Sequence, residues 1–185
     1  PYRDNKLAAR LDILKERLGE CGLPMVYANL VGGQDELVFD GRSLLMNAHG
    51  GFSIRNRPCA EELPIACFSP ASGDLCFEDS AARSGLDKAT ILAAEDITAC
   101  TYAVLVRGLG DYIRKNGFTD VVLGLSGGID SALTAAIAAD AIGPENVTGV
   151  TMPSRYSSDG SVGDSVTLAA KLGIPDSAID PYGHT

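Results

Sequence analysis

The chain has 185 residues, of which 45% are hydrophobic, and it carries a formal net charge of −9. This composition predicts a folded, globular chain of one large or two small domains. An acidic chain without a basic cluster argues against nucleic acid as a partner, because phosphate backbones are bound by Lys and Arg. No apolar run approaches the roughly 20 residues of a membrane span and no signal-peptide core begins the chain, so we expect no membrane partner.

The cysteines indicate a reducing compartment. There are five of them, an odd number without C-x-x-C spacing, at positions 21, 59, 67, 76 and 100. This pattern predicts neither a zinc site nor a disulfide framework. Reduced thiols are the simpler interpretation, and we expect a cytoplasmic protein.

The first half of the chain predicts one helix followed by short strands. Leucines recur at helical spacing from Asp4 to Glu20, and Gly19 or Gly22 can end that helix. Residues 23–31 are typical of a strand buried on both faces in its middle. Three short β runs follow, with Gly50-Gly51 as a hairpin turn, at 42–47, 51–56 and 63–68.

Polar residues in these loops are interpreted as solvated. His49 sits at the hairpin turn without a cysteine or carboxylate at ligand spacing. Asp35 and Glu36 are adjacent carboxylates in a loop, which more often face water than act as an acid and a base. We therefore place no catalytic group at any of the three.

A change of composition marks a candidate boundary. Ser, Pro, Gly, Asp and Ala dominate from Ser69 to Asp87, and few periodic apolar residues occur there. Such a segment is typical of an exposed connection between domains. We therefore predict a linker at 70–87 between a domain over 1–69 and another over 88–185.

Helices and strands alternate in the second half. A long helical pattern covers Lys88 to Asn116, and Gly117 stands where a helix stop belongs. The elements expected after it are a strand at 121–125, a helix at 131–142, a strand at 146–152, a helix at 161–172 and a strand at 178–180. This order predicts an open α/β sheet of parallel strands joined by right-handed crossovers. Ligands of such sheets gather beyond the carboxyl ends of the strands.

The turn after the strand at 121–125 has the features of an anion site. Ser126-Gly127-Gly128 lets the backbone approach an oxygen cluster, and the helix that follows presents N–H groups and a partial positive charge. A carboxylate at Asp130 is most easily explained if a divalent cation lies between it and bound phosphates. Asp130 is thus the candidate metal ligand, and the candidate nucleotide contacts are Gly124, Leu125, Ser126, Gly127, Gly128, Ile129, Asp130 and Ser131.

The two common phosphate motifs are excluded. The kinase and GTPase loop needs a lysine, and none occurs between Lys115 and Lys171. The dinucleotide fingerprint G-x-G-x-x-G is absent, because Gly108-Leu109-Gly110 lies inside a helical pattern. A glycine turn that only packs a helix on a sheet is the remaining alternative, but packing alone needs neither the paired serines nor the aspartate.

A second loop is expected at the same sheet edge. It covers residues 153–159 and contains Arg155. Two roles are possible for this side chain: a contact to nucleotide phosphate or ribose, or a surface salt bridge.

Longer stretches carry a family resemblance. Ser126 to Ser131, S-G-G-I-D-S, resembles the signature of the ATP pyrophosphatases, which adenylate a carboxylate or carbonyl and release pyrophosphate. Residues 116–174, with N-G-F-T-D-V-V-L-G-L-S-G-G-I-D-S-A-L-T and V-T-M-P-S-R-Y-S-S-D-G-S, resemble the first half of the synthetase domain of glutamine-dependent NAD⁺ synthetase. G-L-P-M-V-Y-A-N-L-V-G-G-Q-D-E-L-V-F-D-G, at 22–41, resembles the end of the nitrilase-like glutaminase domain that precedes it. The short signature alone leaves GMP synthetase, asparagine synthetase and tRNA-modifying ligases open.

The resemblance implies a fold and a reaction. The fold would be α/β: the end of a nitrilase-like α-β-β-α sandwich, then the first half of a Rossmann-like adenine nucleotide alpha hydrolase (PP-loop) parallel sheet with helices on both faces. The reaction would use ATP and Mg²⁺ to adenylate the nicotinate carboxylate of deamido-NAD⁺, and ammonia from glutamine would then displace AMP. Another ATP-pyrophosphatase amidotransferase, or a nucleotide-binding module without chemistry, is the alternative.

The chain departs from the family in two ways. The glutamate, lysine and cysteine of the glutaminase triad precede the point where this chain begins, and none of its cysteines has the surroundings of a nucleophile. The chain also stops before the remaining dinucleotide contacts and the second acidic metal ligand that the family has. We therefore expect an internal segment of a longer, homo-oligomeric protein, inactive by itself.

Overall fold

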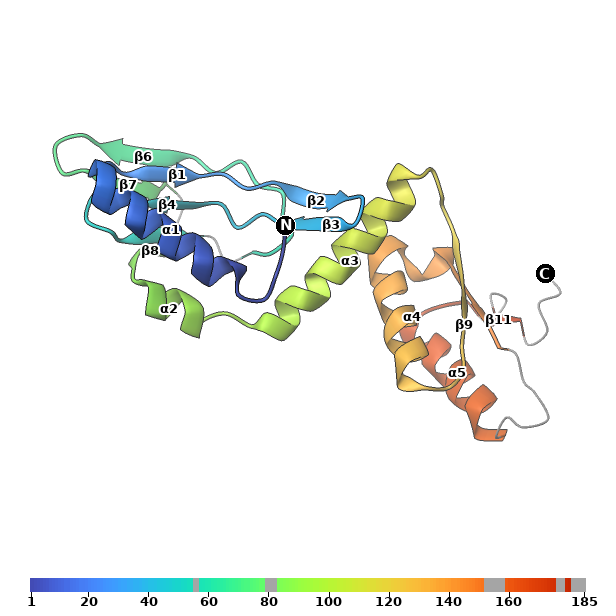
Figure 1. Cartoon of the computed structure of the whole chain (residues 1–185). Helices are drawn as coiled ribbons and strands as arrows, with labels where there is room; N and C mark the ends of the chain where they lie inside the picture. Colours follow the sequence, from blue (N-terminus) through green and yellow to red (C-terminus); the bar gives the residue numbers. More distant parts are fainter. Residues whose placement is uncertain (55–56, 79–82, 152–158, 176–178, 181–185) are drawn as a thin grey trace. The chain divides into compact units, whose positions relative to one another are not determined.

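The computed structural model describes residues 1–54, 57–78, 83–151, 159–175 and 179–180 (Figure 1). The chain divides into two compact units, Pro1–Val104 and Leu105–Thr185. In the described ranges, no helix is long and apolar enough to cross a membrane.

The first unit is built on an antiparallel sheet covered by one helix. The sheet has the order β1 (Met25–Tyr27), β4 (Leu44–Met46), β5 (Phe52–Ile54), β8 (Arg83–Leu86). Helix α1 (Lys6–Cys21) buries its leucine stripe in a cluster made of Leu7, Leu11, Leu14, Leu44, Met46, Phe52, Ile54 and Ile91. The prediction of this helix is confirmed, and it ends at Gly22, whose φ of 65° is a left-handed conformation that suits glycine.

The predicted β4–β5 hairpin is confirmed. Met46 pairs with Phe52, and Gly50 takes a positive φ of 82° in the turn between them. The Asn47 Oδ1 accepts hydrogen bonds from the backbone N–H groups of His49 and Gly51, at 3.0 and 2.8 Å. This side chain closes the turn.

The predicted strand at 23–31 is wrong, because two separate strands occupy this region. Strand β1 stops at Tyr27, and Val31 begins β2 (Val31–Gln34), which pairs with β3 (Leu37–Asp40). Asn29 breaks the run because its Nδ2 donates to the Gly41 carbonyl at 2.7 Å. Val26 is 66% exposed, so the middle of the run is not buried on both faces.

The β2–β3 hairpin was not predicted. Asp35 takes a φ of 51° in its tight turn, a conformation that aspartate tolerates better than most residues. Asp35 and Glu36 lie exposed at the hairpin tip, as expected of solvated carboxylates.

Regular structure also occurs in the segment predicted as a linker. Strand β7 (Asp74–Phe77) pairs with β6 (Ala66–Ser69), and β8 pairs with β5. Leu75 and Phe77 are buried with Leu45. Strands β7 and β8 therefore belong to the first unit, because the few apolar side chains of β7 are enough to join its core.

The predicted helix over 88–116 is two helices, α2 (Lys88–Ala93) and α3 (Ile97–Lys115). The Asp96 carboxylate accepts a hydrogen bond from the Ala99 N–H at 2.9 Å, so it caps a new helix start inside the periodic pattern. The end of α3 is as predicted: Gly117 has a φ of 77° and its N–H donates to the Arg114 carbonyl at 3.1 Å.

The second unit contains the predicted parallel sheet. Its order is β11 (Ile179–Asp180), β10 (Val147–Val150), β9 (Val121–Gly124), and both pairings are parallel. Helix α4 (Ile129–Ile142) follows β9, and a short 3₁₀ turn (Pro144–Asn146) connects α4 to β10. Helix α5 (Asp159–Leu172) follows β10. The core that joins sheet and helices is made of Leu125, Ala135, Ala138, Val147, Ala169 and Ile174.

The expectation of helices on both faces of this sheet is not met at β9. Val121 and Leu123 pack on the core, whereas Val122 is 72% exposed and Gly124 is exposed. Alternate side chains of a strand point to opposite faces. One face of β9 is therefore uncovered within the described residues, whereas the resemblance implied helices on both faces.

Candidate nucleotide-binding site

A buried anchor fixes where the glycine turn begins. The Leu125 N–H donates to the Val150 carbonyl at 2.8 Å and continues the β9–β10 ladder by one residue. The Leu125 side chain is 4% exposed and fills the space beside Gly149, where an added Cβ would lie 2.6 Å from the leucine Cδ1. The backbone that follows Leu125 thus leaves the sheet at a fixed point.

Gly127 is required by both conformation and packing. Its φ is 76°, a left-handed value that L side chains rarely adopt. A Cβ added there would lie 2.8 Å from the Ser161 carbonyl oxygen and 2.9 Å from the Ser161 Cα. The turn therefore rests directly on the first turn of α5, and no larger residue fits without a shift of backbone.

Two serine hydroxyls hold the turn closed. The Oγ atoms of Ser126 and Ser131 are 3.1 Å apart, and the Ser131 hydroxyl donates to the Gly128 carbonyl at 2.9 Å. The Gly128 N–H points to the Ser126 Oγ at 3.3 Å. The pair that the sequence singled out is brought together, on the exposed side of the turn.

The start of α4 is open to an anion. Gly128 is its N-cap, and no side chain caps the helix. The first intrahelical bond runs from the Ala132 N–H to the Gly128 carbonyl, so the N–H groups of residues 129–131 precede the helical ladder. These donors and the helix dipole make this end of α4 suitable for phosphate oxygens.

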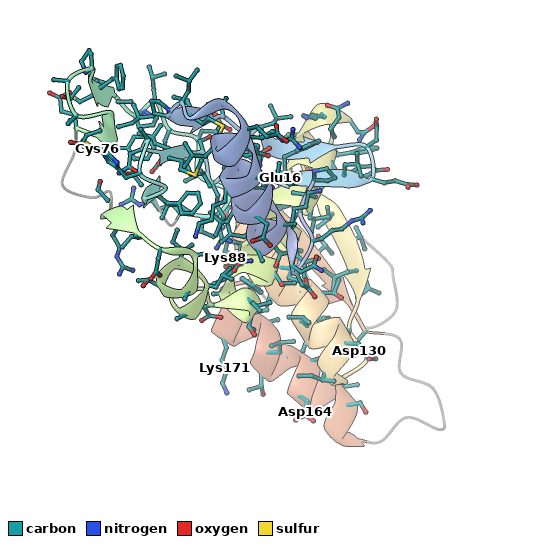
Figure 2. The ribbon with its side chains drawn as sticks, turned by 60° about the vertical axis from the view of Figure 1, so that its left-hand side comes forward. Glu16, Cys76, Lys88, Asp130, Asp164 and Lys171 are labelled. Atoms are coloured by element: carbon teal, nitrogen blue, oxygen red, sulfur yellow. The ribbon has the colours of Figure 1, made fainter. Side chains whose placement is uncertain are left out.

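Asp130 is the second residue of α4 and is exposed there (Figure 2). Among the described residues, no three His, Cys, Asp or Glu side chains come together as a metal site. Mg²⁺ is often held by one or two carboxylates, with phosphate oxygens and water as its other ligands. A single carboxylate beside a phosphate cradle fits that kind of ion and does not fit a cage made by protein alone.

The structure brings the predicted residues Gly124 to Ser131 into one turn, but it does not place Arg155, which lies outside the described residues. Two residues near the turn were not predicted. Ser161 packs on Gly127, and Thr151 follows β10 and is 3% exposed. Both lie in the stretch 150–161 that carries the family resemblance, but only the fold reveals that they lie near the turn.

Cys100 does not have the setting of an activated nucleophile. Burial raises the pKa of the Cys100 thiol, and the Arg42 guanidinium opposes this by donating to its Sγ at 2.6 Å. Cys100 is 4% exposed, so no substrate carbonyl can reach it. Cys21 and Cys67 are exposed at a helix end and on β6.

Sequence comparison finds similarity to NAD⁺ synthetases. Residues 101–182 match the sequence model described as NAD synthase. Glutamine-dependent NAD⁺ synthetase of Rhodobacter capsulatus is 46% identical over 94% of this chain and 30% of its own length. The Synechocystis enzyme of the same name is 39% identical over 99% of this chain and 31% of its own. Over nearly its whole length, this chain is therefore similar to glutamine-dependent NAD⁺ synthetases.

A solved structure agrees. Glutamine-dependent NAD⁺ synthetase from Acinetobacter baumannii, solved in complex with ADP, superposes with a TM-score of 0.80 at 40% identity over 94% of this chain and 31% of that one. The mixed α/β fold and the predicted resemblance to glutamine-dependent NAD⁺ synthetase are thereby confirmed. The chain spans about 30% of the length of the curated relatives it matches.

Proposed function

We propose that this chain carries the pyrophosphate-binding part of an enzyme that amidates deamido-NAD⁺ to NAD⁺ with ATP, Mg²⁺ and glutamine. The observation that carries the proposal is the turn from Ser126 to Ser131, where an uncapped helix start, a left-handed glycine and a hydroxyl pair meet. Similarity to glutamine-dependent NAD⁺ synthetases favours this reaction among those that use such a turn. The ADP in the Acinetobacter baumannii structure supports an adenine nucleotide as ligand.

The residues of the turn have separate roles in this proposal. The N–H groups at the start of α4 and the two serine hydroxyls hold the phosphate oxygens that leave as pyrophosphate. Mg²⁺, when bound at Asp130, would neutralise charge on that leaving group. Gly127 keeps the turn against α5, and Leu125 anchors it to the sheet, so that the donors are fixed before ATP arrives. Arg155 is proposed as a further ATP contact.

The finer fold assignment belongs to the same proposal. The antiparallel sheet with α1 and the similarity to glutamine-dependent NAD⁺ synthetases support the end of a nitrilase-like glutaminase sandwich over 1–69 and a PP-loop synthetase domain that begins at 88. The connection over 70–87 contributes strands β7 and β8 to the sheets of the first unit. The parallel order β11-β10-β9 supports the second assignment. Glutamine hydrolysis would be carried out elsewhere in a cytoplasmic homo-oligomer.

The experiment that tests the proposal uses the chain by itself. We expect weak Mg–ATP binding, measured by calorimetry, and neither glutamate release from glutamine nor NAD⁺ formation from deamido-NAD⁺, ATP and ammonium. Amide hydrolysis needs an activated thiolate, and adenylation needs the acceptor carboxylate held in line with the α-phosphate. Clear turnover in either assay would show that this chain contains catalytic residues that the proposal places elsewhere. A lack of Mg–ATP binding would contradict the assignment of the Ser126–Ser131 turn as the phosphate site.

A further inference from the structure

The β6–β7 hairpin brings two cysteines together across its strands. Cys67 on β6 pairs directly with Cys76 on β7, and both are free thiols in this structure. The two residues are far from C-x-x-C spacing, so only the strand pairing reveals that they are neighbours.

Both thiols lie on the face of the hairpin that points away from the core. Leu75 and Phe77 are buried beside Leu45, so the side chain of Cys76, which lies between them on β7, points to the opposite face (Figure 2). Its cross-strand partner Cys67 shares that face. Cys67 is exposed and Cys76 is half-buried, so a small molecule in solution can reach the pair.

The strand ladder sets a separation that a disulfide can span. The Glu78 N–H donates to the Ile65 carbonyl at 2.9 Å, and hydrogen-bonded pairs alternate along an antiparallel ladder, so Cys67 and Cys76 form the next such pair. The Cα atoms of a hydrogen-bonded pair are about 5.5 Å apart. Disulfides join residues whose Cα atoms are about 4.4–6.8 Å apart. Closure therefore needs rotation of two side chains and little movement of the backbone.

Strand β6 is held less firmly than β7. Every residue of β6 is exposed, whereas β7 buries Leu75 and Phe77. The turn between the strands is anchored, because the Ala48 N–H donates to the Gly73 carbonyl at 3.1 Å. A two-stranded hairpin without burial on one strand opens easily by local unfolding. A covalent bond from β6 to β7 would suppress that opening.

We propose that Cys67 and Cys76 form a reversible disulfide that locks β6 onto β7 when the protein meets a low-molecular-weight disulfide such as oxidised glutathione. The Cys67 thiolate attacks one sulfur of the oxidant and expels a thiolate, and the Cys76 thiolate then displaces the second thiolate from the mixed disulfide. Two electrons pass to the oxidant, and the protons of the two cysteines go to the released thiolates. Exposed disulfides are readily reduced, so the lock opens again in a reducing compartment.

The test equilibrates this chain with glutathione buffers of increasing oxidised fraction, then alkylates the remaining thiols for mass spectrometry. Cleavage after Phe68 leaves the two cysteines on separate peptides unless a disulfide joins them. We expect joined peptides that excess reduced glutathione separates, and the same result for Cys59→Ser, which removes the preceding cysteine. Cys67→Ser should stop at a single glutathione on Cys76. Absence of the joined peptides from the wild type at every buffer ratio, or their presence in Cys67→Ser, would overturn the proposal.

Amide hydrogen exchange tests the lock itself. The amides of β6 are expected to exchange more slowly in the oxidised wild type than in the reduced protein, and Cys67→Ser treated in the same way is expected to show no such change. Cys21→Ser, which removes an exposed thiol on α1, is the matched control and should behave as the wild type does. Equal exchange of β6 in the oxidised and reduced wild type would show that the disulfide does not hold the strand, and the lock would be refuted.

Discussion

Asp130→Asn is expected to lower the turnover of an enzyme that contains this chain by about 10²-fold or more, comparable with the loss of one preorganised electrostatic contact. The carboxylate is exposed in the first turn of α4, which follows the turn that the hydroxyls of Ser126 and Ser131 hold closed. An amide keeps its size but removes the charge that would hold Mg²⁺. The unfolding temperature should change little, because the side chain is exposed.

The matched control is Asp140→Asn, since Asp140 is exposed on the same helix but far from its start. It should leave turnover near the wild-type value. The two variants are compared over a Mg²⁺ titration, with the steady-state rate as the readout. Near-normal turnover of Asp130→Asn at every Mg²⁺ concentration would mean that the carboxylate only stabilises the helix dipole.

Asp40→Asn should have the largest effect on stability, with a loss of about 3–5 kcal/mol in the free energy of unfolding. The Arg10 Nη2 donates to the Asp40 Oδ1 at 2.7 Å, and the side chains are 4% and 2% exposed. The Asn29 Nδ2 donates to the same oxygen at 3.2 Å. Removal of the carboxylate leaves a buried guanidinium without its counter-charge, which is far more costly than the loss of an exposed pair.

Arg17 and Glu20 supply that exposed comparison. They form an ion pair on α1 with side chains 51% and 54% exposed. Glu20→Ala is expected to cost less than about 1 kcal/mol. Urea unfolding of both variants measures the difference, and a loss below about 1 kcal/mol for Asp40→Asn would show that Arg10 finds another partner.

Local patterns predicted most elements of the second unit, because each depends on a few neighbouring residues. The stop at Gly117, the helix after the glycine turn and the parallel strands all follow from periodicity and turn chemistry. The errors arise where a single side chain overrides the pattern. Asn29 divides a run of strand formers, and Asp96 starts a new helix in the middle of an apolar stripe.

The turn from Gly124 to Ser131 was predictable because its residues are contiguous. A contiguous motif carries its own geometry: the hydroxyl pair and the left-handed Gly127 both follow from sequence. Ser161 and Thr151 reach this region only through the parallel pairing of β9 and β10 and the packing of α5. No spacing along the chain indicates such contacts. The positions of Ser161 behind the turn and of Thr151 at the neighbouring strand end could therefore be known only from the fold.

The central claim is that the Ser126–Ser131 turn holds the pyrophosphate of ATP while the α-phosphate reacts. The most direct measurement is product analysis in an enzyme that contains this chain, with ATP labelled separately at the α- and γ-phosphates. The turn lacks the lysine of the kinase loop, and we expect AMP and pyrophosphate in a one-to-one ratio with NAD⁺. ADP and orthophosphate as the stoichiometric products would contradict the assignment.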